Sequence, residues 1–339
     1  MRGLAGRAGM CEDLDRHIRG TAGHEESEMG VGVYELVVRT RQGQVRGRVI
    51  DGVAVFKGMP YAAAPFGPNR FGQPQPAATW DGVRDAFEYG PTVPKPPYFP
   101  PFDAIIAEPA IPGEDCLNLN VWTPDPGNRD LPVMVWIHGG AFSNGSGAVP
   151  VYDGGRFARN GVVCVTINYR LGADGFLFLG DGIANLGLLD QVAALQWVQE
   201  NIAVFGGDPA RVTVAGESAG AMSVTTLLSM PRAQGLFRRV IAESGAGHHA
   251  LTPATARMVG GYLADKLGVP ATRESIGQVP VESLTAAQVA LSADAFGAPD
   301  PARWEGPARP RRRAPARTAS GWPRPRATEP GLARRTHRR

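Results

Sequence analysis

Residues 212–221, VTVAGESAGA, decide the fold of this 339-residue chain. A run of β-branched and small apolar residues leads into GESAG at 216–220, which fits the pattern G-x-S-x-G. This pattern is typical of a serine on a sharp, strained turn between a strand and a helix. A Cβ two residues before or after that serine would collide with neighbouring backbone, so both positions need glycine. The strand before the motif favours Ser218 as a nucleophile over a residue in an ordinary glycine-rich turn.

The residues around the serine also predict an oxyanion hole. A helix that starts after the serine would place its positive dipole end behind it, and the N–H of Ala219 would face a developing oxyanion. HGGAF at 138–142 directly follows the apolar run PVMVWI, and small residues there let backbone N–H groups turn towards the serine. We expect Gly140 and Ala141 to be further donors, rather than parts of an ordinary β-turn. His138 lies on the oxyanion side and is predicted as a positioned loop residue, not as the catalytic base.

Four apolar runs predict the strands of a sheet that is mostly parallel and buried on both faces. They lie at 132–137, 161–170, 211–215 and 238–244. Between the second and third runs, apolar residues recur at helical spacing at positions 188, 192, 195, 198 and 202. Gly206-Gly207 is expected to end that helix. Strands that alternate with helices in this way predict an α/β fold.

The remaining segments are expected to form shorter strands, one long loop and further helices. YELVVRT and VRGRVI flank Gln42-Gly43, a candidate hairpin turn. Residues 89–113 are crowded with prolines and are predicted as a surface loop, whereas residues 252–300 are expected to be helical. A half-buried strand is predicted from the apolar residues at 117, 119 and 121.

Composition divides the chain into a folded body, residues 31–300, and two disordered ends, 1–30 and 301–339. Hydrophobic residues make up 43% of the chain, enough for a sizeable core. Residues 301–339 hold 12 arginines and two glutamates, so this tail carries +10 while the rest of the chain carries −7. The tail contains no Ile, Val, Met, Phe, Tyr or Cys, and such a segment cannot supply a core strand.

The cysteine content and the length of the apolar runs bear on the kinds of site in the protein and on its cellular location. Cys11, Cys116 and Cys164 do not suggest a disulfide framework, and their spacing does not resemble a zinc site. No apolar run reaches the length of a membrane span. Residues 1–30 contain no apolar leader segment, so we expect a cytoplasmic protein. Arg outnumbers Lys by 32 to 3, which indicates a GC-rich gene and a bacterial source.

Taken together, these motifs resemble the type-B carboxylesterases of the α/β-hydrolase superfamily. The resemblance implies that residues 31–300 form a partial α/β-hydrolase domain. It also implies hydrolysis of small-molecule carboxylic esters without a metal or an organic cofactor. The matching stretches run in the family order from about residue 45 to 247: FKGMPYAAAP, RFGQPQP, EDCLNLNVW, VMVWIHGGAF, VYDGGRFA, INYRLGADGFL, NLGLLDQVAALQWVQENIAVFGGDP, VTVAGESAGAMSV and GLFRRVIAESG.

The same resemblance assigns roles to single residues. Ser218 matches the nucleophile of the family. Gly140, Ala141 and Ala219 match the oxyanion hole. Glu217, directly before the serine, matches a residue near the site that tunes its electrostatics.

Two ion pairs and one thiol are also implied by the resemblance. The pairs are Arg70 with Glu114 and Arg170 with Asp190. If they are buried, removing one partner costs about 3–5 kcal/mol, whereas solvated surface pairs are worth under about 1 kcal/mol. Cys116 matches one half of a disulfide found in many members. No cysteine stands where its partner would lie, so we predict a free thiol.

The acid and the histidine of a catalytic triad are not found in the sequence. The superfamily order is serine, acid, histidine. His248 and His249 come too early in the chain to match the histidine of the family. His337 lies in the arginine-rich tail, as do the two glutamates of that tail. We hypothesise that the chain is the N-terminal part of an esterase, ended by a frameshift or a premature stop. Without a base Ser218 is a weak nucleophile, so near-zero activity is expected, and poor solubility because the sheet would keep an open edge.

Two other functions compete with ester hydrolysis. A non-catalytic, esterase-like binding module is one, but it would need neither G-x-S-x-G nor HGGAF. Twelve tail arginines would bind nucleic acid with a strong salt dependence. Out-of-frame translation of a GC-rich gene explains the tail better, so we expect no nucleic-acid partner. The particular ester and the oligomeric state stay open at this point.

Overall fold

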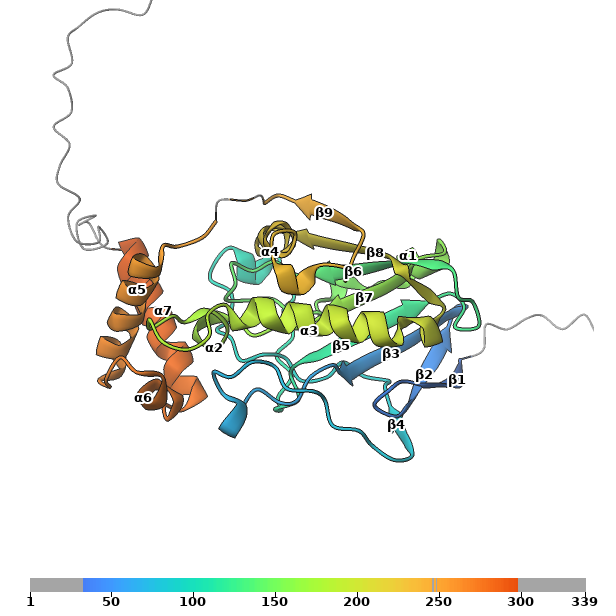
Figure 1. Ribbon diagram of the computed structural model, residues 1–339, viewed down its shortest axis with the longest axis horizontal. Coiled ribbons are helices and arrows are strands. Elements are labelled where there is room, and N and C mark those ends of the chain that lie inside the picture. The colour runs from blue at the N-terminus through green and yellow to red at the C-terminus, as the bar shows by residue number, and fades with distance from the viewer. Residues whose placement is uncertain (1–32, 246, 248, 298–339) are drawn as a thin grey trace, which may run out of the picture. The chain divides into compact units, whose positions relative to one another are not determined.

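A mixed sheet runs through the fold, which a computed structural model describes for residues 33–245, 247 and 249–297 (Figure 1). The segments predicted as disordered, 1–30 and 301–339, lie outside the described residues, as do Cys11, His248 and His337. The strands are β1 (Tyr34–Arg39), β2 (Gln44–Ile50), β3 (Val53–Pro60), β4 (Val83–Asp85), β5 (Asn118–Thr123), β6 (Leu131–Ile137), β7 (Val163–Ile167), β8 (Gly207–Glu217) and β9 (Arg239–Glu243). The helices are α1 (Gly155–Arg159), α2 (Gly172–Phe176), α3 (Leu186–Asn201), α4 (Ala219–Leu227), α5 (Pro253–Leu267), α6 (Arg273–Gly277) and α7 (Val281–Gly297). Short 3-10 helices span Gly67–Asn69, Phe102–Ala104, Pro150–Tyr152, Ile202–Phe205 and Pro231–Ala233.

The sheet has an antiparallel half and a parallel half. Among the described residues its order is β1-β2-β3-β5-β7-β6-β8-β9, with β4 paired to β2. Strands β1, β2, β3, β5 and β7 pair antiparallel in succession, and β1 and β2 form the predicted hairpin. Strands β7, β6, β8 and β9 run parallel and come from the four apolar runs. The α/β class is confirmed. The prediction that all four runs are buried was wrong, because β9 is largely exposed at the edge of the sheet.

The register of the parallel strands brings the two glycine-rich motifs to one end of the sheet. Ile137, the last residue of β6, is paired with Ile167 of β7 on one side and with Gly216 of β8 on the other. HGGAF follows β6 directly, and Ser218 follows β8 directly. Ligand sites of open parallel sheets lie at such carboxyl ends.

Strand β5 is buried on both faces, so the prediction of a half-buried strand was wrong. Its polar residues Asn118 and Asn120 are each 2% exposed. Asn118 Nδ2 donates to the carbonyls of Pro91 and Asp115, both at 2.8 Å. Asn120 Nδ2 donates to Thr166 Oγ1 at 2.9 Å. Polar side chains whose hydrogen-bonding groups all have partners are stable in a core. Their alternation with apolar residues therefore does not show that one face of the strand is exposed to solvent.

Helix α3 lies across the sheet in the view of Figure 1 and carries the predicted apolar stripe. The helix ends at Asn201, and a 3-10 turn continues to Gly206, whose φ of 86° stops it as expected. All five residues of the stripe are buried: Leu188, Val192, Leu195, Val198 and Ile202.

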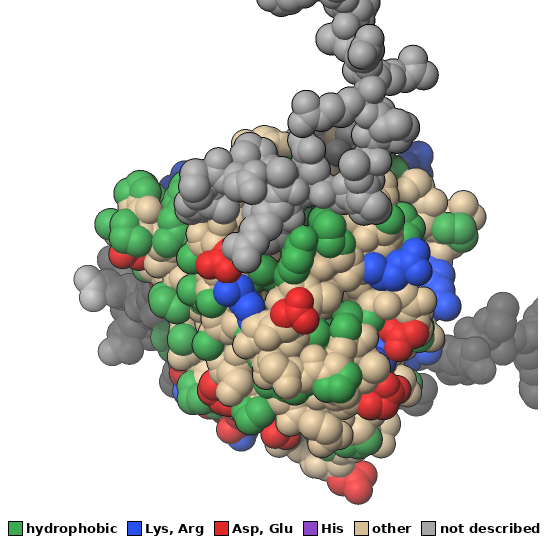
Figure 2. All heavy atoms as spheres, turned by 90° about the vertical axis from the view of Figure 1, so that its left-hand side faces the viewer, with side chains coloured by type: hydrophobic (Ala, Val, Ile, Leu, Met, Phe, Trp, Pro, Cys, Tyr) green, Lys and Arg blue, Asp and Glu red, His purple; other side chains and the backbone are tan. Residues whose placement is uncertain are grey.

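Residues 253–297 form three helices, as the sequence predicts for this region. Thr252 caps α5 and Thr272 caps α6, each by accepting a backbone N–H three residues further on. Apolar residues of the three helices pack with Phe71 and with α2 in a second core. On the face turned to the viewer in Figure 2, acidic and basic side chains lie interspersed among apolar ones.

The proline-rich segment 89–113 contains only one 3-10 turn, but it is not a surface loop throughout. Thr92 and Val93 are buried. The side chains of Lys95 and Glu108 are only 4% and 10% exposed. Proline prevents regular structure there, yet it does not prevent the neighbouring side chains from packing onto the body of the molecule.

Candidate active site

Ser218 lies on the turn between β8 and α4, with φ 54° and ψ −118°. This is a left-handed φ that costs free energy for a residue with a Cβ. Two backbone hydrogen bonds hold the turn: Ser218 N–H donates to Glu243 O at 2.9 Å, and Met222 N–H donates to Ser218 O at 3.0 Å. A Cβ on Gly216 would lie 2.6 Å from the backbone of Gly220. The glycine before the serine is therefore required by the packing of the turn on itself.

The loop after β6 passes directly beside the serine. A Cβ on Gly139 would lie 3.2 Å from Ser218 Cβ and 2.7 Å from Glu217 Oε2. The three residues that follow all have a positive φ, namely 105° at Gly140, 54° at Ala141 and 59° at Phe142. Two of these carry a Cβ, so the turn is strained in the same sense as the serine.

The backbone N–H groups of this turn are available to a ligand. The turn is closed by hydrogen bonds from Ser143 N–H and Asn144 N–H to Gly140 O, at 2.9 and 2.8 Å. Within the described part of the chain, the N–H groups of Gly140 and Ala141 make no hydrogen bond. The N–H of Ala219 belongs to the first turn of α4, where it has no acceptor inside the helix. The turn and the helix start thus offer three donors beside Ser218.

His138 anchors the start of this loop inside the protein. Its ring is stacked on Tyr169 with centroids 4.5 Å apart, and its Nδ1 lies 2.8 Å from Gly139 O. Tyr169 Oη donates to His138 O at 2.9 Å. Burial lowers the pKa of His138 from 6.5 to about 4. The imidazole is neutral at pH 7, and its surroundings are those of a positioned loop residue.

A buried ion pair that the sequence did not reveal holds the far end of the loop. Glu108 Oε2 accepts the N–H of Gly145 at 2.8 Å, and its Oε1 lies 3.2 Å from Lys95 Nζ. Asn144 Nδ2 donates to Pro96 O at 2.6 Å. Burial lowers the pKa of Lys95, and Glu108 opposes that shift. The only sequence signal was one lysine and one glutamate inside a proline-rich, largely apolar segment.

Glu217 precedes the serine and is half-buried. Burial raises its pKa, and the negative charge of Glu243 raises it further. The two residues are paired in the register of β8 and β9, so two carboxylates face each other at the end of these strands.

No described histidine is positioned to activate the serine. His249 is the one described histidine that follows Ser218, and it is exposed. Its ring is stacked on Phe142 with centroids 6.4 Å apart. Among the described residues, no histidine forms a hydrogen bond with Ser218 Oγ or with a carboxylate.

One of the two predicted ion pairs is confirmed, and the other has a different partner. Arg170 Nε donates to Asp190 Oδ2 at 2.8 Å and its Nη2 to Oδ1 at 2.7 Å, with both side chains at most 2% exposed. Arg70 was predicted to pair with Glu114. Instead it binds Asp174 at 3.0 Å, and Glu114 is exposed. Asp174 lies on α2, so the motif that contains Glu114 did not identify the partner of Arg70.

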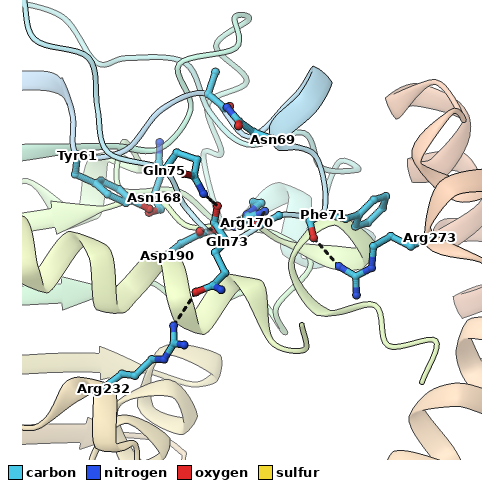
Figure 3. A network of polar contacts seen from close by, with 12 residues as sticks. Tyr61, Asn69, Phe71, Gln73, Gln75, Asn168, Arg170, Asp190, Arg232 and Arg273 are labelled. Carbon is cyan, nitrogen blue, oxygen red and sulfur yellow. Dashed lines mark hydrogen bonds and ion pairs between the residues drawn. The ribbon is translucent and has the colours of Figure 1, made fainter. Parts of the chain in front are cut away.

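Figure 3 shows the polar network around the confirmed pair, which ties segment 69–75 to the body. Arg170 Nη1 donates to Gly72 O at 2.8 Å. Gln73 Oε1 accepts from Arg232 Nη1 at 2.7 Å, and Phe71 O accepts from Arg273 Nη1 at 2.5 Å. Arginines from three parts of the chain thus hold this one segment.

Cys116 is buried with a free thiol, as predicted, and so is Cys164. Burial raises the pKa of each thiol to about 12. The described residues hold no group of three or more His, Cys, Asp or Glu side chains suited to a metal ion. They also include no helix with the length and apolar character needed to cross a membrane.

Comparison with known proteins finds carboxylesterases both by sequence and by structure. A family model described as the carboxylesterase family matches residues 34–295. The para-nitrobenzyl esterase of Bacillus subtilis is 51% identical over 215 residues, which are 62% of this chain and 44% of that protein. The cholinesterase of Mus musculus is 45% identical over 228 residues, 63% of this chain and 38% of that protein.

The similar solved structures include the carboxylesterase EST55 of Geobacillus stearothermophilus. It superposes with a TM-score of 0.68 at 49% identity, covering 75% of this chain and 54% of that chain. A thermophilic para-nitrobenzyl esterase superposes with a TM-score of 0.72 at 44% identity, covering 77% and 55%. The fold is that of the α/β-hydrolases, and the chain spans about half the length of the proteins that it matches.

Proposed function

Because the chain belongs to the carboxylesterase family, whose model matches residues 34–295, we propose that the protein hydrolyses small-molecule carboxylic esters with Ser218 as the nucleophile. Ser218 Oγ attacks the carbonyl carbon and loses its proton to a base, and the ester C–O bond breaks to release the alcohol. Water then cleaves the acyl-serine and releases the acid. The observation that carries the proposal is the strained turn at Ser218, with the glycine loop after β6 packed directly against it.

The oxyanion hole of the proposed reaction consists of the N–H groups of Gly140, Ala141 and Ala219. Negative charge develops on the carbonyl oxygen during attack, and preorganised donors stabilise it. Loss of one such donor typically lowers turnover by about 10²–10³. The positive φ values at Gly140 and Ala141 support this role, as does the absence of a hydrogen bond from their N–H groups among the described residues.

Glu217 is proposed to tune the electrostatics of the site rather than to serve as the triad acid. Its carboxylate lies against Gly139, on the loop that leads to the oxyanion donors. A negative charge there disfavours a second negative charge and favours a cationic partner. Glu217 would then stabilise a positively charged base during the reaction.

The chain as given is proposed to turn over esters very slowly. None of the described residues supplies a base to Ser218. His138 is not suited to that role, because its ring is buried and its pKa is low. Removal of a triad base leaves an enhancement of about 10³–10⁴ over water, from the oxyanion hole and substrate binding. The complete reaction would need an acid and a histidine from residues beyond the described ones.

Reaction with a fluorophosphonate tests the nucleophile directly. Serine oxygen replaces fluoride on phosphorus, so over a long incubation intact mass should increase by one phosphonyl group, slowly because no described residue acts as a base, and peptide mapping should locate the group on Ser218. The variant Ser218→Ala should not react, while Ser229→Ala, two residues after the end of α4, should react like the unchanged chain. Labelling of another residue, or equal labelling of Ser218→Ala, would contradict the proposed nucleophile and favour a non-catalytic binding module.

A further inference from the structure

The turn at residues 140–145, which carries two of the proposed oxyanion donors, depends on contacts from outside itself. Ala141 and Phe142 have a positive φ although each carries a Cβ. Such a conformation persists only where the surrounding structure holds it in place. The turn closes through Gly140 O, which accepts the N–H groups of residues 143 and 144. A movement of its last residues is therefore passed on to Gly140.

One carboxylate, that of Glu108, reaches both ends of this turn, one directly and one through Tyr98. At the far end, Glu108 Oε2 accepts the N–H of Gly145 at 2.8 Å. At the near end, the Tyr98 hydroxyl lies 2.9 Å from the position that a Cβ on Gly140 would take. Burial raises the pKa of Tyr98, and the adjacent charge of Glu108 raises it further. The Tyr98 hydroxyl is therefore close to both Glu108 and the start of the turn.

A lysine compensates the charge of this carboxylate. Glu108 Oε1 lies 3.2 Å from Lys95 Nζ, and the two side chains are only 10% and 4% exposed. A neutral acceptor could also bind the N–H of Gly145, so that hydrogen bond alone does not require a charge. A buried carboxylate without a cation is strongly destabilising. Lys95 is thus the residue that allows a carboxylate to stand at this position.

The charge of Glu108 also bears on the reaction proposed for Ser218. Attack on an ester places negative charge on the carbonyl oxygen. A second carboxylate, that of Glu217, already lies against Gly139. Besides burial, the charges of Glu108 and Glu217 both raise the pKa of Tyr98, so both act on the space beside the turn. Lys95 offsets one of two charges that would oppose the oxyanion.

We propose that Glu108 is a positioning residue for the proposed ester hydrolysis and that Lys95 offsets its charge. Glu108 acts through the turn rather than on the substrate. It holds residues 140–145 so that the N–H groups of Gly140 and Ala141 stay directed at the developing oxyanion. The inference rests on the proposed function, because without reaction at Ser218 there is no oxyanion to stabilise.

The rate at which a fluorophosphonate modifies Ser218 in the full chain tests the positioning role. The phosphoryl oxygen gains negative charge during attack and would use the same donors. Because loss of a whole donor costs about 10²–10³, release of the turn by Glu108→Ala should lower the maximal rate by about tenfold or more. The reagent concentration that gives half the maximal rate should stay the same. Glu108→Gln keeps an acceptor of the same size and should restore the rate.

The direction of two further effects separates this role from a merely structural one. Lys95→Met and Glu108→Gln break the same ion pair, so a loss of stability alone would slow modification in both. The proposal predicts a difference between them. Lys95→Met leaves a carboxylate without its cation and should slow the reaction several-fold, whereas Glu108→Gln leaves a positive charge and should not slow it. The double variant Lys95→Met/Glu108→Gln is neutral and should react like the unchanged chain.

A destabilised control shows whether stability alone governs the rate. Ile276 is fully buried in the second core, which the helices α5 to α7 form with Phe71 and α2. Ile276→Val removes one buried methylene group and lowers stability without changing a contact of the turn. Its reaction with the fluorophosphonate should match that of the unchanged chain.

Three results would overturn the proposal while leaving the nucleophile in place. The first is modification of Ser218 at the same rate in Glu108→Ala and in the unchanged chain. The second is slowing of Lys95→Met and Glu108→Gln by the same factor. The third is slowing of Ile276→Val as strong as that of Glu108→Ala. Absence of modification at Ser218 in the unchanged chain would instead contradict the proposed function, and this inference with it.

Discussion

Two buried ion pairs brace this molecule, and they differ in how completely they are satisfied. Asp190 accepts hydrogen bonds from the Nε, Nη2 and backbone N of Arg170, and both side chains are at most 2% exposed. Lys95 has only Glu108, at 3.2 Å, and its Nζ makes no hydrogen bond within the described residues. Both pairs are removed from water, and the first has more hydrogen bonds to set against that cost. The first fixes the scaffold, and the second holds the loop beside Ser218 less tightly.

The largest expected effect comes from breaking the fully satisfied pair. Arg170→Ala leaves the carboxylate of Asp190 buried and unpaired, which should lower the free energy of unfolding by about 3–5 kcal/mol. Calorimetry should show a clear fall in Tm. Arg232→Ala removes an exposed arginine from the same network and should change Tm little. An unchanged Tm for Arg170→Ala would remove the contrast between the two pairs.

The loop that Glu108 holds at one end is anchored at the other end by His138, and acid should release that anchor. The unfolded chain takes up a proton near the ordinary pKa of 6.5, but the folded chain does so only near 4. The contribution of the neutral imidazole to the free energy of unfolding is fully present above pH 6.5. It falls as the pH decreases, and about 3 kcal/mol is lost at pH 4. Urea unfolding between pH 7 and 4 measures it, and His138→Gln should flatten the slope. Equal slopes for both chains would exclude this anchor.

Breaking the incompletely satisfied pair should cost less. Lys95→Met keeps most of the buried volume, and Glu108 retains its bond to the N–H of Gly145. We expect a loss of about 1–3 kcal/mol, the cost of one buried group left without its partner. Glu108→Gln is the matched variant that keeps an acceptor for Gly145. A loss as large as that of Arg170→Ala would show that the two pairs are equivalent.

The smallest effect is expected at an exposed pair, which sets the lower end of the comparison. Arg46 Nη2 lies 2.7 Å from Asp85 Oδ1, but the two side chains are 38% and 50% exposed. Solvent screens exposed pairs, so the coupling between their charges is small. A double-mutant cycle of Arg46→Ala and Asp85→Ala should return a coupling well below that of Lys95 and Glu108. A coupling above that of Lys95 and Glu108 would mean that burial is not what separates these pairs.

The serine turn and the glycine-rich loop after β6 were predictable because their sequence patterns are local. Gly216 is required by its contact with Gly220 in the same turn, and HGGAF follows an apolar strand whose neighbours in the sheet are also apolar. Gly220 is required instead by the close approach of Ile137 and His138, a long-range contact that the pattern G-x-S-x-G implies without identifying its partner. The chemical roles of these residues remain proposals. The position of β6 beside β8 then brings the two motifs together without further information from the sequence.

The long-range partners could not be predicted in the same way. Lys95 and Glu108 are joined by an irregular segment, where no periodicity indicates which side chains turn inwards. Arg70 was assigned to Glu114, but side-chain reach in three dimensions placed it on Asp174. The buried asparagines of β5 looked like exposed positions, because hydrogen bonding inside a core leaves no trace in an alternation pattern.

The hydrogen bond from Ser218 N–H to Glu243 O makes the outermost strand part of the support of the serine. A displacement of β9 changes one end of that bond, and a change in the backbone of Ser218 changes the other. Because this bond joins the two elements, any movement of β9 acts directly on the strained backbone of Ser218.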